Sequence, residues 1–215
     1  NWQRIPEFAE VIRQSPAAEV AAGLMGSKAV QLFHDHVLVK EPGTSKPTPW
    51  HQDAPYYFVE GTQTVSFWTV VEPVTEATLR CVAGSHLWSK PVLPTRWLKE
   101  DAFYPDDDAY IPVPDPDAEG MRVLEWELEP GDAVAFDFRC LHGARGNAAA
   151  TRRRAFSLRL VGDDARFVQR PGRTSPPFPG HGMQPGDRLR EDWFPVIWRD
   201  GAAQPFETPV IEAAE

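Results

Sequence analysis

The sequence predicts a single domain with an all-β core and flanking helices. Segments rich in β-branched and aromatic residues recur along the chain, separated by turns that contain Pro and Gly. Strong helix formers are concentrated near the N-terminal end, between Ala17 and Met25. The chain has 215 residues, of which 42% are hydrophobic, and this is enough for one substantial core. We therefore expect one domain over residues 1–215.

The helical segment is expected over residues 1–30. Ser15 is a suitable N-cap, Pro16 suits the first helical position, and Gly26 is expected to end the helix. The residues that follow favour strands, because β-branched and apolar side chains then dominate each segment between turns. Beyond the strand expected around residues 51–53, we expect strands over residues 31–40, 64–71, 79–82, 123–128, 133–138 and 154–161.

Two segments fall outside this strand pattern. Residues 87–120 are irregular and acidic, and loops of this size form either lids or plain surface loops. Residues 170–215 begin with a stretch rich in Pro and Gly, which predicts an extended tail wrapped over the body. Neither segment suggests a second domain, and the chain has no internal repeat.

The charge balance limits the classes of partner. The chain has 22 basic and 31 acidic residues, a formal net charge of −9, which argues against a general surface for nucleic acid or anionic membranes. A small-molecule partner is expected instead. Two cysteines are too few for a disulfide framework, and no apolar run is long enough to span a bilayer. We expect a cytoplasmic protein, although a chain that begins with Asn1 leaves targeting open, and the oligomeric state is not predicted.

The triplet His51-Gln52-Asp53 is a candidate half of a metal site. In an extended strand, residues two apart point to the same face, so His51 and Asp53 can bind one metal ion while Gln52 faces elsewhere. His142 would complete the site from a distant strand. Two imidazoles and one carboxylate suit non-haem Fe(II), because three positions stay open for a cosubstrate and O2. A structural zinc site would close all four positions.

The last predicted strand places basic residues on a single face. Alternation puts Arg153, Ser157 and Arg159 on one side and apolar residues on the other, and we expect the polar side to face an active-site cavity. Arg153 follows His142 by 11 residues.

The order of these motifs resembles the phytanoyl-CoA dioxygenase family of Fe(II)/2-oxoglutarate-dependent oxygenases. The resemblance covers about residues 31–162, and the ordered set is far more specific than any single motif. The matching segments are Lys40-Glu41-Pro42-Gly43, His51-Gln52-Asp53, Phe67-Trp68-Thr69, Gly84-Ser85-His86, His142 and Arg153.

The resemblance implies a double-stranded β-helix, a jelly-roll that encloses the metal at one open end. It also implies that His51, Asp53 and His142 form the facial triad. Arg153 would hold the distal carboxylate of 2-oxoglutarate, for which a planar guanidinium is suited. It places Trp68 beside the cosubstrate and matches Gln52 to a glutamine within the metal triplet. Lys40 and His36, on the preceding strand, are further candidates for contact with the cosubstrate.

The implied reaction uses Fe(II), 2-oxoglutarate and O2, releases succinate and CO2, and hydroxylates an unactivated C–H bond. Asp53 favours hydroxylation over halogenation, because halogenating relatives replace this carboxylate with a small residue; desaturation stays open. Ala144 stands where the family often has a hydroxyl-bearing residue. Trp50, Tyr56 and Tyr57 flank the triad and are candidates for the substrate pocket, although ordinary packing explains such aromatic residues equally well.

Two alternatives remain at this stage. The first is a cupin-type metal site that uses His34 and His36 with Glu41 and a later histidine. The second is a non-catalytic binding jelly-roll that has kept the pocket. The substrate is not predicted, although the acidic region 100–119 argues against a CoA thioester, whose phosphates need basic partners.

Overall fold

The computed structural model describes residues 1–96, 101–105 and 108–207. Within these residues the helices are α1 (Pro6–Gln14) and α2 (Ala17–Met25), with short 3-10 turns η1 (Ala54–Tyr56) and η2 (Ser85–Leu87). The strands are β1 (Ala29–Lys40), β2 (Thr48–His51), β3 (Val59–Glu60), β4 (Thr64–Val70), β5 (Arg80–Val82), β6 (Thr95–Arg96), β7 (Asp101–Ala102), β8 (Val123–Glu125), β9 (Ala133–Phe136), β10 (His142–Ala144), β11 (Arg153–Val161), β12 (Arg166–Phe167), β13 (Val196–Arg199) and β14 (Ala202–Ala203).

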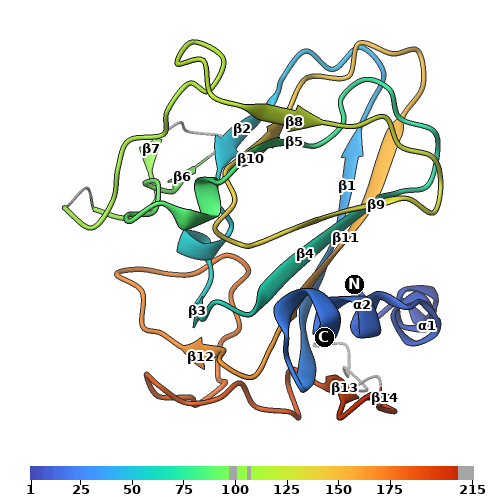
Figure 1. Cartoon of the computed structure of the whole chain (residues 1–215), viewed down its shortest axis with the longest axis vertical. Helices are drawn as coiled ribbons and strands as arrows, with labels where there is room; N and C mark the ends of the chain where they lie inside the picture. The colour runs from blue at the N-terminus through green and yellow to red at the C-terminus, as the bar shows by residue number, and fades with distance from the viewer. Residues whose placement is uncertain (97–100, 106–107, 208–215) are drawn as a thin grey trace, which may run out of the picture.

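Two antiparallel sheets form the core (Figure 1). The larger has the strand order β14-β13-β1-β11-β4-β9, and the smaller has the order β2-β10-β5-β8. Two further strand pairs, β12-β3 and β6-β7, lie outside them. The all-β core with flanking helices is therefore confirmed.

The helices cover one face of the larger sheet (Figure 1). Ile12 of α1 and Ala21 of α2 share a buried apolar cluster with Leu32, Phe156 and Leu160 of the sheet. Alanine suits this interface because it lets helix and sheet approach closely while burying apolar area. The other face of the sheet is thus left to line the interior between the two sheets.

The helical segment contains two helices, and the sequence pattern indicated only the second. Gly26 ends α2 in the left-handed conformation, with φ of 61°, as predicted. Ser15 is not its N-cap: Pro16 occupies that position, and Ser15 is the C-cap of α1. The first helix was missed because no side-chain cap marks its start at Ile5.

The alternation predicted for the last strand is confirmed in β11. Arg153 and Arg159 are buried at 5% and 4% exposure on the side of the sheet away from the helices, whereas Arg154 is exposed. Phe156 and Leu158 belong to the cluster beneath the helices. The strand is therefore buried on both faces, one apolar and one polar.

The segment 87–120 is partly packed against the body. Val92 is 1% exposed and forms a bridge with Ile111, while β6 and β7 form a small hairpin. Residues 97–100 and 106–107 of the segment lie outside the described residues, and its role as a lid stays a prediction. β13 and β14, which follow the Pro- and Gly-rich stretch of the predicted tail, extend the larger sheet beyond β1.

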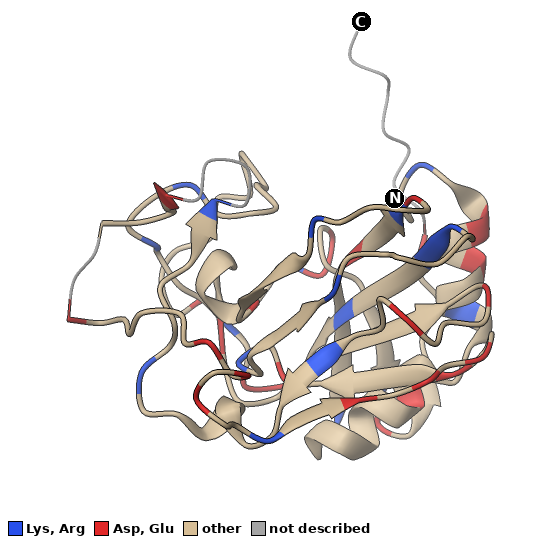
Figure 2. Cartoon of the chain, turned by 90° about the horizontal axis from the view of Figure 1, so that it is seen from above, with Lys and Arg blue, Asp and Glu red and all other residues tan. Residues whose placement is uncertain are grey.

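Charged residues of both signs are interspersed around the chain (Figure 2). No helix in the described part of the chain has both the length and the apolar character needed to cross a membrane.

Candidate metal centre and active site

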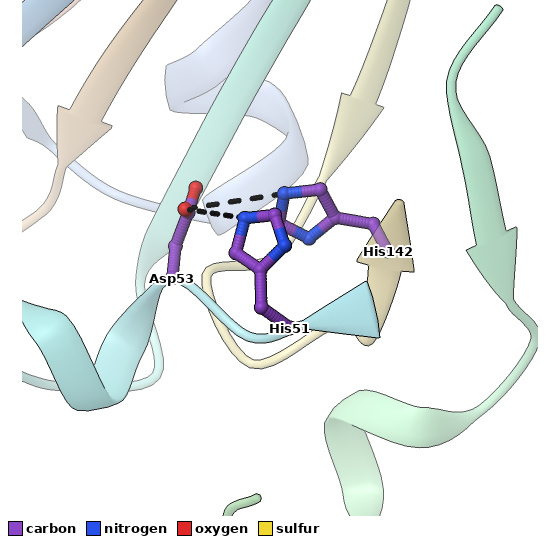
Figure 3. A group of neighbouring side chains, drawn as sticks. All are labelled: His51, Asp53 and His142. Atoms are coloured by element: carbon purple, nitrogen blue, oxygen red, sulfur yellow. Dashed lines mark ion pairs between the residues drawn. The ribbon is translucent and has the colours of Figure 1, made fainter. Parts of the chain in front are cut away.

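Three buried side chains converge at the edge of the smaller sheet (Figure 3). The Nε2 atoms of His51 and His142 lie 3.7 and 3.9 Å from Oδ1 of Asp53. One ligand atom from each residue can be chosen so that all three lie within 4.8 Å of one another. His51 ends β2, and His142 begins β10 directly opposite it in the antiparallel register. Strand pairing thus brings together two histidines that are far apart in the sequence.

Asp53 reaches the site by a turn and not by strand alternation. β2 ends at His51, and Asp53 has helical backbone angles, φ −70° and ψ −40°, at the N-cap of η1. The amide of Tyr56 donates to the Asp53 carbonyl at 3.0 Å, which closes this turn. The predicted pairing of His51 with Asp53 is correct, but the extended geometry expected for the triplet is wrong.

Both histidines present Nε2 to the site. Nδ1 of His51 lies 2.8 Å from the Pro49 carbonyl, and Nδ1 of His142 lies 3.0 Å from the Cys140 carbonyl. Because a carbonyl only accepts hydrogen bonds, each Nδ1 must carry the proton, which leaves Nε2 with a lone pair. Burial lowers the pKa of His51, and burial together with His51 lowers the pKa of His142 to about 3. Both rings are therefore neutral at neutral pH.

The carboxylate of Asp53 is held through its second oxygen. Nε and Nη2 of Arg159 lie 3.1 and 3.0 Å from Oδ2, and the Ser66 hydroxyl lies 3.4 Å from it. Burial alone would raise the pKa of Asp53, but the charge of Arg159 and the two nearby histidines lower it below its usual range. Asp53 is ionised, with Oδ1 facing the imidazole nitrogens. This donor set fits a divalent transition-metal ion with open positions.

The three residues open into a cavity of about 670 Å³. The predicted residues that line it besides the triad are His36, Lys40, Tyr56, Tyr57, Trp68 and Arg153. The sequence thus located most of one continuous site from five separate parts of the chain.

Arg153 is a buried cation without an anionic partner among the described residues. Its Nη1 donates to the Leu38 carbonyl at 3.4 Å, its guanidinium carbon lies 5.2 Å from the ring centre of Trp68, and its Nε has no hydrogen-bond partner. Burial lowers its pKa to about 10. Lys40 lies opposite Arg153 in the β1–β11 register, and burial, then Arg153, lowers the pKa of Lys40 to about 8. This end of the cavity is suited to a carboxylate.

Two predicted residues do not line the cavity. The side-chain oxygen Oε1 of Gln52 accepts from the backbone amide of Val92 at 2.9 Å, and Nε2 of Gln52 donates to the Arg139 carbonyl, so the side chain is fully engaged elsewhere. Trp50 packs with a different apolar cluster, and the guanidinium of Arg80 lies 5.0 Å from its ring centre. The cosubstrate contact of Gln52 and the substrate contact of Trp50 are therefore not supported. Gln52 instead anchors the turn that carries Asp53.

The fold does not bring together the residues of the cupin-type metal site. The rings of His34 and His36 lie 4.5 Å apart, but Glu41 is exposed and paired with Arg152 at 2.9 Å. Only His51, Asp53 and His142 form a potential metal-binding group among the described residues.

Sequence reasoning missed the role of Arg159. Alternation placed it on the cavity side of the strand, but only the fold shows that it faces Asp53. Its position six residues beyond Arg153, on the same face, was the one available signal.

An antiparallel β fold with a buried group of two histidines and one carboxylate defines a metal-binding site of the facial-triad type. The chain belongs to the phytanoyl-CoA dioxygenase family, whose model matches residues 3–155. The matched range contains the triad and Arg153. The family resemblance predicted from the sequence is thereby confirmed.

A Caenorhabditis elegans protein described as "Probable phytanoyl-CoA dioxygenase" is 30% identical over 178 residues. The alignment covers 79% of this chain and 55% of that protein, so the chain spans little more than half the length of this relative.

Solved structures show the same fold. The carbocyclase SnoK from nogalamycin biosynthesis, described as a non-haem alpha-ketoglutarate-dependent enzyme, has a TM-score of 0.68 at 24% identity, with 91% of this chain and 72% of that chain covered. The epimerase SnoN, in complex with Fe3+, alpha-ketoglutarate and nogalamycin RO, has a TM-score of 0.70 at 24% identity, with coverages of 89% and 74%. EvdO2 from Micromonospora carbonacea var. aurantiaca, complexed with 2-oxoglutarate, has a TM-score of 0.58 at 26% identity, with coverages of 77% and 67%.

Proposed function

We propose that the chain is an Fe(II)- and 2-oxoglutarate-dependent oxygenase that hydroxylates an unactivated C–H bond of a small molecule. One observation carries the proposal: a buried, unpaired Arg153 shares a cavity with a buried group of two neutral histidines and one ionised carboxylate. A metal site alone would not need the cation, and an anion site alone would not need the three ligands. A 2-oxo acid with a second carboxylate satisfies both.

The proposed fold is a double-stranded β-helix. Strands β1, β11, β4 and β9 would form its major sheet, and β2, β10, β5 and β8 its minor sheet. The similarity to SnoK and SnoN over most of the chain supports this assignment. In it, the triad lies at the ends of minor-sheet strands, where the interior is open to a ligand.

The residues of the site would have separate roles. His51, Asp53 and His142 would hold the iron on one side and leave the remaining positions for ligands. Arg153 and Lys40 would bind the distal carboxylate of 2-oxoglutarate, with the Trp68 ring against the guanidinium. When bound, iron with 2-oxoglutarate and O2 supplies the oxidation that releases succinate and CO2. The protein contributes orientation and a cavity whose walls are mainly apolar.

The substrate would occupy the rest of the cavity. Tyr56, Thr95 and Phe103 line this part, and the Tyr56 hydroxyl both accepts from the amide and donates to the carbonyl of Thr95 at 2.8 Å. His36 also faces this cavity. Asp53 occupies the position that a halide would need, which favours hydroxylation over halogenation. We keep a cytoplasmic location as part of the proposal.

The test of this proposal is oxygen-dependent succinate formation. The protein is loaded anaerobically with Fe(II) and 2-oxoglutarate, offered a metabolite library, and exposed to O2. We expect at least one compound to raise succinate above the uncoupled background and to gain one oxygen atom. A protein that binds iron and 2-oxoglutarate but yields no product with any compound would favour the non-catalytic alternative.

The ionisation of Lys40 predicts a pH dependence of cosubstrate binding. The lysine is charged below its pKa of about 8, and a bound carboxylate favours the charged form. Affinity for 2-oxoglutarate should therefore be fully present below pH 8 and should fall as the pH rises through and above it. Titrations from pH 6.5 to about 9.5 measure the effect, which K40M should remove. The same pH profile in K40M would contradict this role.

A further inference from the structure

Arg159 is built into the wall of the cavity directly behind Asp53. It is 4% exposed, and two of its nitrogens lie within 3.1 Å of a single carboxylate oxygen, Oδ2. The other oxygen, Oδ1, faces the two histidines at 3.7 and 3.9 Å. The two oxygens of Asp53 therefore have different environments: one bonded to the protein and one directed to the metal site.

The neighbours of Arg159 fix its position. Its Nη1 donates to the Ser157 hydroxyl, which in turn donates to the Phe67 carbonyl at 2.7 Å. Its Nε also lies 3.3 Å from the Tyr57 hydroxyl. Ser66, which lies directly opposite Arg159 in the β11–β4 register, approaches the same Asp53 oxygen. All three guanidinium nitrogens therefore have a partner within the protein.

We propose that Arg159 is a positioning residue that restricts Asp53 to binding the metal through Oδ1 alone. A carboxylate can bind a metal ion with one oxygen or with two. Binding with two would take one of the positions that a chelating 2-oxo acid needs. By holding Oδ2, Arg159 keeps that position open, and this role rests on the proposed function.

The role differs from that of Arg153. Arg153 would recognise the distal carboxylate, so its loss should affect 2-oxoglutarate but not pyruvate, a 2-oxo acid without a second carboxylate. Arg159 would act on the metal's open positions, so its loss should weaken both acids equally. A merely structural role for the Arg159–Asp53 pair predicts neither pattern.

The experiment compares R159M, R159K and R153L with R154M as the matched control. Arg154 is on the same strand but exposed, where it pairs with Glu72 at 3.0 Å. Each variant is titrated with Co(II), with Fe(II) under anaerobic conditions, and then with 2-oxoglutarate or pyruvate. Absorption spectra report the Co(II) coordination and the Fe(II)–2-oxo acid complex, and circular dichroism reports folding.

For R159M we expect metal binding that is weakened by about 10- to 100-fold but still measurable, and a changed Co(II) spectrum. At saturating metal, the binding of both 2-oxo acids should be weaker by the same factor. R159K should fall between R159M and wild type, and R154M should match wild type. Wild-type Co(II) spectra and 2-oxo acid affinities in R159M would overturn the inference. If R159M does not fold, the Co(II) spectrum and the 2-oxo acid affinities of R159K test the inference instead.

The two proposals fail in different ways. If the wild-type protein binds Co(II) but neither 2-oxo acid, the proposed function is wrong, and the Co(II) spectra of R159M and R159K alone decide the role of Arg159. If the wild type binds both acids and the Arg159 variants do so equally well, only the positioning role is wrong.

Discussion

Replacing His142 by alanine is expected to abolish metal binding and succinate formation. His142 is one of the three candidate ligands among the described residues, and its Nε2 faces Asp53 with the proton held on Nδ1. Loss of an outer partner of a metal ligand costs about 10- to 100-fold in affinity, so loss of a ligand should cost at least about 100-fold. Anaerobic equilibrium dialysis with Fe(II) measures this directly. The free energy of unfolding of the metal-free protein should fall by only about 1–3 kcal/mol.

His34 offers the matched control. It is 5% exposed, close to the exposure of 3% for His142, but it does not line the cavity. H34A should keep iron binding within about twofold of wild type, a difference below 0.5 kcal/mol. The cupin-type alternative predicts loss of iron in H34A, and that result would refute the facial triad.

The sequence identified the candidate metal ligands, which the fold brings together, because their motif is local and its context is ordered. His51 and Asp53 are two residues apart, and His142 and Arg153 follow in the sequence order expected for the family. The route by which Asp53 reaches the site was not predictable from alternation. The turn η1 depends on how Ala54 to Tyr56 pack, and Pro55, which lacks an N–H for strand pairing, was only a weak signal against an extended strand.

Side-chain direction explains the two errors among the predicted contacts. Gln52 and Trp50 neighbour His51 in the sequence, but Gln52 is bonded to Val92 and to the Arg139 carbonyl. Both partners lie in segments distant in the sequence, so only the folded chain decides which way the side chain points. Arg159 was missed for the same reason, because its partner Asp53 lies 106 residues away.

The strands were predicted well where alternation is long and less well where it is short. β11 has nine residues, and its buried face followed from period 2 alone. β8 and β9 were expected over residues 123–128 and 133–138, but they end at Glu125 and Phe136. Their ends are set by the partner strands, because β5 pairs with only three residues of β8. The length of a partner strand cannot be deduced from the sequence of the strand that pairs with it.

Replacing Arg153 by leucine is expected to separate cosubstrate binding from metal binding. The guanidinium lies over Trp68 in the cavity that contains the triad, and the triad is bonded to other residues. Hydrogen bonds to charged groups contribute about 1.5–3 kcal/mol, so 2-oxoglutarate affinity should fall by about 10- to 150-fold. Iron affinity should change by less than about threefold, which is under 0.7 kcal/mol. Calorimetric titration of each ligand provides the measurement, and R152L, at an exposed arginine paired with Glu41, is the control.

The R153L substitution should not lower the thermal stability of the ligand-free protein, although it lowers the affinity for 2-oxoglutarate. In the protein without 2-oxoglutarate, Arg153 is a buried cation with one orphaned nitrogen, and its pKa is lowered to about 10 by burial. Replacing an unpaired buried charge with an apolar side chain removes a desolvation penalty. The melting temperature of R153L should therefore equal or exceed that of wild type in the absence of 2-oxoglutarate. At the same concentration, 2-oxoglutarate should raise the melting temperature of wild type more than that of R153L, because stabilisation by a ligand increases with the affinity for it. Equal losses of iron and 2-oxoglutarate binding, or a lower melting temperature without ligand, would show that Arg153 supports the fold and not the cosubstrate.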